Sequence, residues 1–196
     1  MPRKSIIKRK TTETDISLEL NLDGQGRADV KTPIPFLDHM LTLFARHGLF
    51  DLKIRAKGDI EVDLHHTVED VGLCLGEALK KAIKDKSGIR RYGNAHVPMM
   101  DSLALVALDL SGRPYLKYDA RISRIRTKDA FDPRLVEEFM KAFSNSAGID
   151  LHIRLNYGND PHHAIEAIFK ATGRALSEAV MRDVRIKGVM STKGRF

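Results

Sequence analysis

The sequence His65-His66-Thr67-Val68-Glu69 recurs as His162-His163-Ala164-Ile165-Glu166, 97 positions further along the chain. The match continues without a gap through the residues that follow, which pair as Gly76 with Gly173, Leu79 with Leu176 and Ala82 with Ala179. Agreement in the same order over a stretch of this length indicates an internal duplication rather than the chance recurrence of a short motif.

The duplication extends upstream of the motif. Phe44 and the segment 51–55 correspond to Phe143 and the segment 150–154, with an offset of 99 positions. Further back, the segment 20–24 corresponds to 108–112. We therefore expect two halves, 1–94 and 95–196, and a chain of 196 residues is long enough for them to form one compact unit with a sizeable core.

The same order of elements is predicted in each half. Alternating apolar residues, a turn and a further extended stretch predict two strands, followed by an amphipathic helix, a third strand and a long helix that starts at the His-His motif. The predicted ranges are 16–22, a strand after Asp23-Gly24, 35–46, 52–56 and a helix from 65, and then 103–110, 115–120, 132–143, 151–155 and a helix from 162. This is an α+β fold of two β-β-α-β-α halves, which we expect to pack against each other through their helices.

The repeated doublets are candidate metal ligands. Residues i, i+3 and i+4 of a helix share a face, so either histidine of a doublet can reach an ion together with the glutamate. Adjacent helical residues point roughly 100° apart, so one ion does not readily take both histidines. We therefore expect each doublet to serve two metal sites, and each site to receive one histidine from each half.

Two further histidines, His39 on the first short helix and His152 on the strand before the second doublet, complete the set. Divided between two sites, the candidates give three histidines and one carboxylate each. Such mixed ligation suits Mn, Fe, Co, Ni or Zn, and octahedral space for substrate and water favours Mn. The eight predicted ligands are His39, His65, His66, Glu69, His152, His162, His163 and Glu166.

Charge and composition narrow the possible functions. The net charge of +7 and a short basic arm, residues 4–10, fit nucleic-acid binding, an anionic small substrate or ordinary surface charge. Trp is absent, and helix-turn-helix, zinc-finger and aromatic RNA-binding patterns are not found, so a nucleic-acid partner is not expected. No apolar run approaches 18 residues, which predicts no membrane span. The only cysteine, Cys74, lies in an apolar helical stretch, and a buried thiol in a reducing cytoplasm is expected.

The motifs, taken together, resemble the imidazoleglycerol-phosphate dehydratase family almost from end to end. Besides the doublets, the resemblance rests on Pro35-Phe36-Leu37-Asp38-His39-Met40, Gly88-Ile89-Arg90-Arg91-Tyr92-Gly93, Asp109-Leu110-Ser111-Gly112-Arg113-Pro114-Tyr115 and Ser191-Thr192-Lys193-Gly194. It implies a fold like that of the second domain of ribosomal protein S5 and a hydro-lyase of histidine biosynthesis. The reaction would remove water from imidazole glycerol phosphate to give imidazole acetol phosphate.

The resemblance also implies two Mn ions per active site and a homo-oligomer, a shell of 24 subunits built from trimers. Substrate-binding roles are implied for Arg91, Arg113, Lys170, Ser191 and Lys193. Glu13 is a candidate acid or base, although its repeat counterpart, Asp101, leaves a structural role for a carboxylate at this strand entry open. His47 is a second catalytic candidate, although a lone histidine on an amphipathic helix is more often structural.

One position departs from the family pattern. The chain has Pro98-Met99-Met100-Asp101, in which Asp101 is kept and Met100 stands where the family usually has a first carboxylate. We expect the reaction to survive this change. If the first carboxylate orders a loop or contacts the site, its loss would alter activity or assembly. Two other hypotheses stay open: a different metalloenzyme such as a hydrolase, and a nucleic-acid-binding module. The first lacks a His-Glu-x-x-His protease motif, and the second gives no reason for the duplicated doublets.

Overall fold

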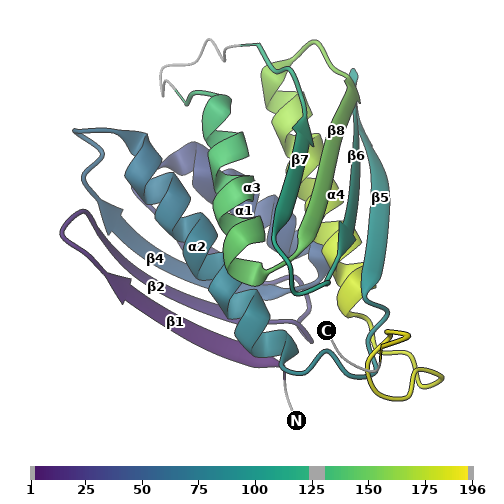
Figure 1. The fold of residues 1–196 in the computed structure, drawn as a ribbon. Helices are drawn as coiled ribbons and strands as arrows, with labels where there is room; N and C mark the ends of the chain where they lie inside the picture. The colour runs from purple at the N-terminus through teal and green to yellow at the C-terminus, as the bar shows by residue number, and fades with distance from the viewer. Residues whose placement is uncertain (1–2, 124–130, 194–196) are drawn as a thin grey trace.

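The computed structural model describes residues 3–123 and 131–193, and within them two four-stranded sheets enclose a layer of four helices (Figure 1). The first half contains β1 (Lys4–Lys10), β2 (Thr14–Asn21), β3 (Ala28–Lys31), α1 (Pro35–Gly48), β4 (Asp51–Gly58) and α2 (Leu64–Ile83). The second half contains β5 (Tyr92–Met99), β6 (Ser102–Asp109), β7 (Tyr115–Asp119), α3 (Arg134–Ala147), β8 (Asp150–Tyr157) and α4 (Pro161–Val180).

The two sheets have the same topology. Their strand orders are β1-β2-β4-β3 and β5-β6-β8-β7, and in each the last pair is parallel and the others are antiparallel. Strand β2 buries Ile16, Leu18 and Leu20, and β6 buries its alternate residues in the same way. This two-residue period directs one face of each sheet toward the helices.

The halves meet through their helices, α1 against α4 and α2 against α3. Glycines on the long helices allow this close approach. A Cβ at Gly173 of α4 would lie 2.5 Å from the Phe44 carbonyl oxygen of α1, and a Cβ at Gly76 of α2 would lie 2.5 Å from the Phe143 carbonyl oxygen of α3. The two Gly–Phe pairs are repeat counterparts, so the same contact is made twice across the boundary between the halves.

The structure confirms the predicted α+β fold of two repeated halves packed through their helices, and it adds one strand at the start of each half. The basic arm at residues 4–10 is strand β1. Strand β5 includes residues 94 and 95, between which the sequence places the division of the halves.

Two further predictions from the sequence concern the burial of the cysteine and membrane-spanning helices. Cys74 is fully buried in α2, and its burial raises the pKa of the thiol to about 12, as expected for an inert core cysteine. Among the described residues, no helix combines the length and the apolar character needed to cross a membrane.

Candidate metal centre

Both His-His doublets lie in the first turn of a long helix and begin two residues after the aspartate that caps the helix. The Asp63 carboxylate accepts a hydrogen bond from the His65 amide at 2.9 Å, and the Asp160 carboxylate accepts one from the His162 amide at 2.7 Å. Aspartate is a favoured N-cap because its carboxylate satisfies amides that have no partner within the helix. The two capping aspartates thus determine where each helix begins, and both doublets lie at the N-terminal end of their helix.

The two rings of each doublet diverge. Their centroids are 6.3 Å apart in both doublets, with interplanar angles of 86° for His65–His66 and 82° for His162–His163. The first histidine of each doublet contacts the glutamate of its own motif, and the second contacts a different carboxylate. His66 Nδ1 lies 3.1 Å from Asp59 Oδ2, and His163 Nδ1 lies 2.8 Å from Asp101 Oδ1.

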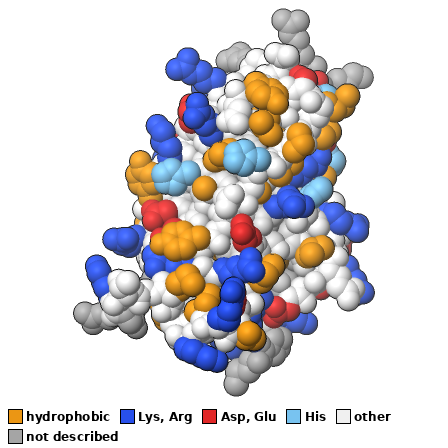
Figure 2. Space-filling model, turned by 90° about the vertical axis from the view of Figure 1, so that its right-hand side faces the viewer, with side chains coloured by type: hydrophobic (Ala, Val, Ile, Leu, Met, Phe, Trp, Pro, Cys, Tyr) orange, Lys and Arg blue, Asp and Glu red, His pale blue; other side chains and the backbone are white. Residues whose placement is uncertain are grey.

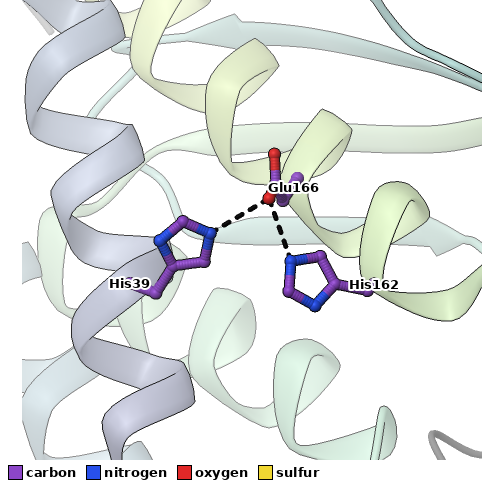
Figure 3. A group of neighbouring side chains, drawn as sticks. All are labelled: His39, His162 and Glu166. Carbon is purple, nitrogen blue, oxygen red and sulfur yellow. Dashed lines mark hydrogen bonds and ion pairs between the residues drawn. The ribbon is translucent and has the colours of Figure 1, made fainter.

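His39, His162 and Glu166 form the candidate metal centre (Figure 3). One oxygen of Glu166, Oε1, lies 3.0 Å from Nε2 of His39 and 3.0 Å from Nε2 of His162. All three candidate donor atoms lie within 4.8 Å of one another. Because His39 belongs to α1 and the other two belong to α4, the group joins the two halves of the chain.

The electrostatics of Glu166 suit a metal ligand. The side chain is buried, which raises its pKa, but hydrogen bonds from Lys170 and His39 outweigh burial and lower the pKa to about 2. Lys170 Nζ lies 2.5 Å from the second oxygen, Oε2, and balances the charge of the buried carboxylate. One ionised carboxylate and two imidazoles are a donor set that divalent transition metals accept.

The counterpart of this group in the other half is different. His65 Nε2 lies 3.2 Å from Glu69 Oε2, a contact similar to the 3.0 Å contact of His162 with Glu166. The α3 residue that corresponds to His39 is Glu138, which lines a small cavity together with His65. The sequence analysis did not predict Glu138 or Asp59 as residues near the doublets. The offset of 99 between the two short helices could have indicated Glu138, because it places Glu138 at the position of His39.

The remaining predicted ligands and catalytic candidates lie apart from the His39–His162–Glu166 group. His152 is exposed on β8, where its ring lies 5.6 Å from that of Tyr115. Glu13 precedes β2, and its Oε2 is 4.0 Å from His66 Nδ1. His47 lies near the end of α1, where burial and the charges of Lys170 and Arg174 lower its pKa. In the described part of one chain, the eight predicted ligands therefore do not converge on one place.

Four of the five predicted substrate-binding residues line one cavity of about 870 Å³: Arg91, Arg113, Ser191 and Lys193. Arg91 is anchored there by a bidentate ion pair with Asp109, at 2.7 Å from Nε and 2.9 Å from Nη2. The fifth residue, Lys170, lies instead beside Glu166. The cavity has the cationic and hydroxyl groups that a phosphate group requires.

The fold and these groups define a class, a duplicated α+β domain with a candidate metal centre of histidine and glutamate and a separate cationic cavity. A family model described as imidazoleglycerol-phosphate dehydratase matches residues 32–176. The chain belongs to the imidazoleglycerol-phosphate dehydratase family, as the sequence motifs led us to expect.

Relatives of known name match the chain over its length. It is 57% identical to the imidazoleglycerol-phosphate dehydratase of Geobacter sp. strain M21 over 196 residues, which is 100% of both chains. The enzyme of that name from Acetivibrio thermocellus is 56% identical over 99% of each chain. The crystal structure of the Staphylococcus aureus enzyme is 42% identical, with a TM-score of 0.79 over 91% of this chain and 100% of that one. The Pyrococcus furiosus enzyme is 37% identical, with a TM-score of 0.83 over 97% of this chain and 100% of that one.

Proposed function

We propose that the protein is a hydro-lyase of histidine biosynthesis that dehydrates imidazole glycerol phosphate to imidazole acetol phosphate. The observation that carries this proposal is similarity over the full length, at more than half identity, to enzymes named imidazoleglycerol-phosphate dehydratase. A group of two histidines and one glutamate that could hold a metal ion supports it. Incubation of the purified protein with imidazole glycerol phosphate and Mn²⁺ tests this proposal directly. We expect one imidazole acetol phosphate for each substrate consumed, and substrate that stays intact would contradict the proposal.

The proposed metal is Mn²⁺, with two ions in each active site. The proposed ligands are His39, His65, His66, Glu69, His152, His162, His163 and Glu166. A bound divalent ion would supply Lewis-acid stabilisation of negative charge on the imidazole ring of the substrate, beside a C–H bond that is not acidic by itself. Glu166 and His162 are supported by the geometry of their group, and the divergence of each doublet supports binding to two different ions.

Proton transfer at the reacting carbons is assigned to Glu13. Its side chain is about half exposed, and its Oε2 lies 4.0 Å from Nδ1 of His66, a proposed metal ligand. The carboxylate is therefore accessible to a substrate held beside that ligand. His47 is the second candidate, because burial and the cations around it lower its pKa and so favour the neutral, proton-accepting imidazole.

The phosphate of the substrate is assigned to the cavity of Arg91, Arg113, Ser191 and Lys193, and Lys170 is assigned to the substrate beside the metal centre. We expect Lys193→Ala to raise KM about tenfold or more, because a charge-assisted contact to phosphate contributes about 1.5–3 kcal/mol. Lys187→Ala is the matched control, since Lys187 is exposed in the same C-terminal segment and does not line the cavity. Steady-state kinetics and metal analysis check this, and an unchanged KM in Lys193→Ala would remove Lys193 from the phosphate site.

The proposed assembly is a homo-oligomer of 24 subunits in the cytoplasm. Two observations support an oligomer: one chain leaves the predicted ligands dispersed, and the outer faces of the two sheets differ in character. At the outward positions of β2 stand Asp15, Ser17 and Glu19, whereas their counterparts on β6 are Leu103, Leu105 and Ala107. On the side of β5, hydrophobic side chains lie among histidine and basic side chains (Figure 2). Light scattering is expected to give about 24 times the 22.0 kDa mass of the chain, and a monomeric mass would contradict the assembly.

A further inference from the structure

We propose that Asp70 is a positioning residue that fixes the loop carrying Glu13, a role that rests on the proposed function of Glu13. Asp70 directly follows the motif glutamate Glu69 in α2, but its side chain points away from the candidate ligands and into a buried network. The residue is 8% exposed. Oδ1 accepts a hydrogen bond from Arg9 Nε at 3.0 Å, and Oδ2 accepts one from the Thr14 hydroxyl at 2.5 Å.

The Thr14 hydroxyl connects Asp70 to the backbone of Glu13. The oxygen of the Thr11 hydroxyl lies 3.2 Å from that of Thr14 and accepts hydrogen bonds from the amides of Glu13, at 3.1 Å, and Thr14, at 2.9 Å. Because Thr14 donates its proton to Asp70, its oxygen is left to accept the Thr11 proton. The Glu13 amide thus donates to Thr11, the Thr11 hydroxyl to Thr14, and the Thr14 hydroxyl to the Asp70 carboxylate. Hydrogen bonds arranged in such a series strengthen one another.

The network holds the Glu13 backbone while its side chain stays accessible. On the other side of this residue, the Glu13 carbonyl oxygen accepts a hydrogen bond from the Asp59 amide at 3.2 Å, and Asp59 is the residue that contacts His66. Asp70 therefore links the position of Glu13 to the helix whose first turn carries His65 and His66. A displacement of about 1 Å at a reacting group can lower a rate about 100-fold, so the link bears on turnover.

The second half of the chain shows that the fold itself does not require this carboxylate. The repeat counterpart of Asp70 is the buried Ala167, and that of Arg9 is Val97. Asp101, the counterpart of Glu13, is held in another way, by His163 and by the amides of Asn159 and Asp160. A buried carboxylate at this position of the long helix is thus found in the half that carries Glu13 and not in the other half.

Four variants, assayed as the assembled Mn²⁺-loaded enzyme, test this role. Asp70→Asn replaces one acceptor oxygen by an amide that faces either Arg9 or Thr14, both of which are donors. Thr14→Val removes the hydroxyl at nearly constant volume, and Thr14→Ser keeps it, as Ser102 does at the counterpart position. Asp23→Asn is the matched control. Asp23 also forms an ion pair with an arginine beside β1, Arg3, but it lies at the opposite end of β2 from Thr14.

We expect Asp70→Asn and Thr14→Val to lower kcat about tenfold or more, with KM and Mn content within about twofold of wild type. Thr14→Ser and Asp23→Asn are expected to keep the wild-type kcat within about threefold. In a Glu13→Gln background, Asp70→Asn should cause little further loss, because residues that act as a unit are not additive.

Three results would overturn the proposal: a wild-type kcat in Asp70→Asn and Thr14→Val, a loss that follows Mn content, or an undiminished loss in the Glu13→Gln background. If Asp70→Asn does not assemble, the test rests on Thr14→Val and Thr14→Ser. A kcat in Thr14→Val as high as that in Thr14→Ser would then overturn the proposal. Absence of turnover in the wild-type enzyme would contradict the proposed function itself, whereas an active wild type with equally active variants would contradict only the role of Asp70.

Discussion

Met100 has a backbone conformation that its side chain does not favour. Its φ is +48°, and it lies in the two-residue turn between β5 and β6, where Met99 pairs with Ser102. Asparagine, aspartate and glycine enter this left-handed region at lower cost than methionine does. An aspartate or asparagine at this position would therefore suit the turn better, and the methionine costs local backbone strain.

We expect Met100→Asn to raise the free energy of unfolding by about 1 kcal/mol, since a left-handed non-glycine residue costs on the order of 1–3 kcal/mol. Met181→Asn is the control, because Met181 is also exposed but has a φ of −60°. Thermal or urea unfolding measures both variants. An equal change in stability in the two variants would show that the turn conformation of Met100 carries no special cost.

Glu166 should make the metal-free protein sensitive to acid. Its pKa is lowered from 4.5 to about 2 in the fold, where burial opposes ionisation and Lys170, His39 and His162 favour it. A carboxyl with a lowered pKa stabilises the fold above its unfolded pKa, and this contribution is lost as the pH falls toward the folded pKa. Between about pH 5 and pH 3, metal-stripped wild type should thus lose more unfolding free energy than Glu166→Gln. Urea titrations at each pH measure this, and parallel losses would contradict it.

At the residue scale, the sequence predicts what depends on local geometry. Helical periodicity alone leads to the divergence of the two histidines in a doublet. It does not predict that His39, rather than a member of the first doublet, contacts His162, because this contact depends on how α1 packs against α4. The contact of Asp59 with His66 comes from a loop without a recognisable motif.

At the element scale, the repeated glycines of α2 and α4 set the distance between the helix pairs. In Gly173→Ala, the new Cβ would meet backbone of α1 rather than the end of a flexible side chain. We expect a net loss of stability, because overpacking costs about 1–3 kcal/mol and the gain in helix propensity is at most about 1 kcal/mol. Arg174→Ala, at the next and exposed position of α4, is the control and should change stability little. A Gly173→Ala protein that is more stable than wild type would contradict this account of the helix contact.

The strands that sequence analysis missed, β1 and β5, are both at the edge of a sheet. The fully buried positions of β5 carry the small or medium-sized Gly93, Ala95 and Val97, and in β1 the apolar Ile6 points outward beside the buried Ile7. Small inward residues in β5 and an apolar outward residue in β1 weaken the alternation of apolar and polar residues on which strand prediction depends. Strands β2, β4, β6 and β8 and the four helices were predicted because each buries an apolar face. Strands β3 and β7 contain no fully buried residue, and they were predicted from the turn that precedes each of them.

At the scale of the whole molecule, duplication explains both the fold and the distribution of the site. We propose that the halves 1–94 and 95–196 act as one unit, since the candidate metal centre takes His39 from one half and His162 and Glu166 from the other. Six of the eight proposed ligands were selected from the repeated motif, and His39 and His152 were added to complete the set. Where these side chains meet depends on packing between the halves and, in the proposed assembly, between subunits, which sequence spacing does not encode.

The most direct test of a metal-dependent dehydratase is turnover of imidazole glycerol phosphate by enzyme stripped with a chelator, then by the same enzyme after Mn²⁺ is restored, alongside His162→Ala. The account predicts no product from stripped enzyme, recovery in the wild type on addition of Mn²⁺, and no recovery in His162→Ala. Full turnover by the stripped enzyme, or wild-type recovery in His162→Ala, would contradict it.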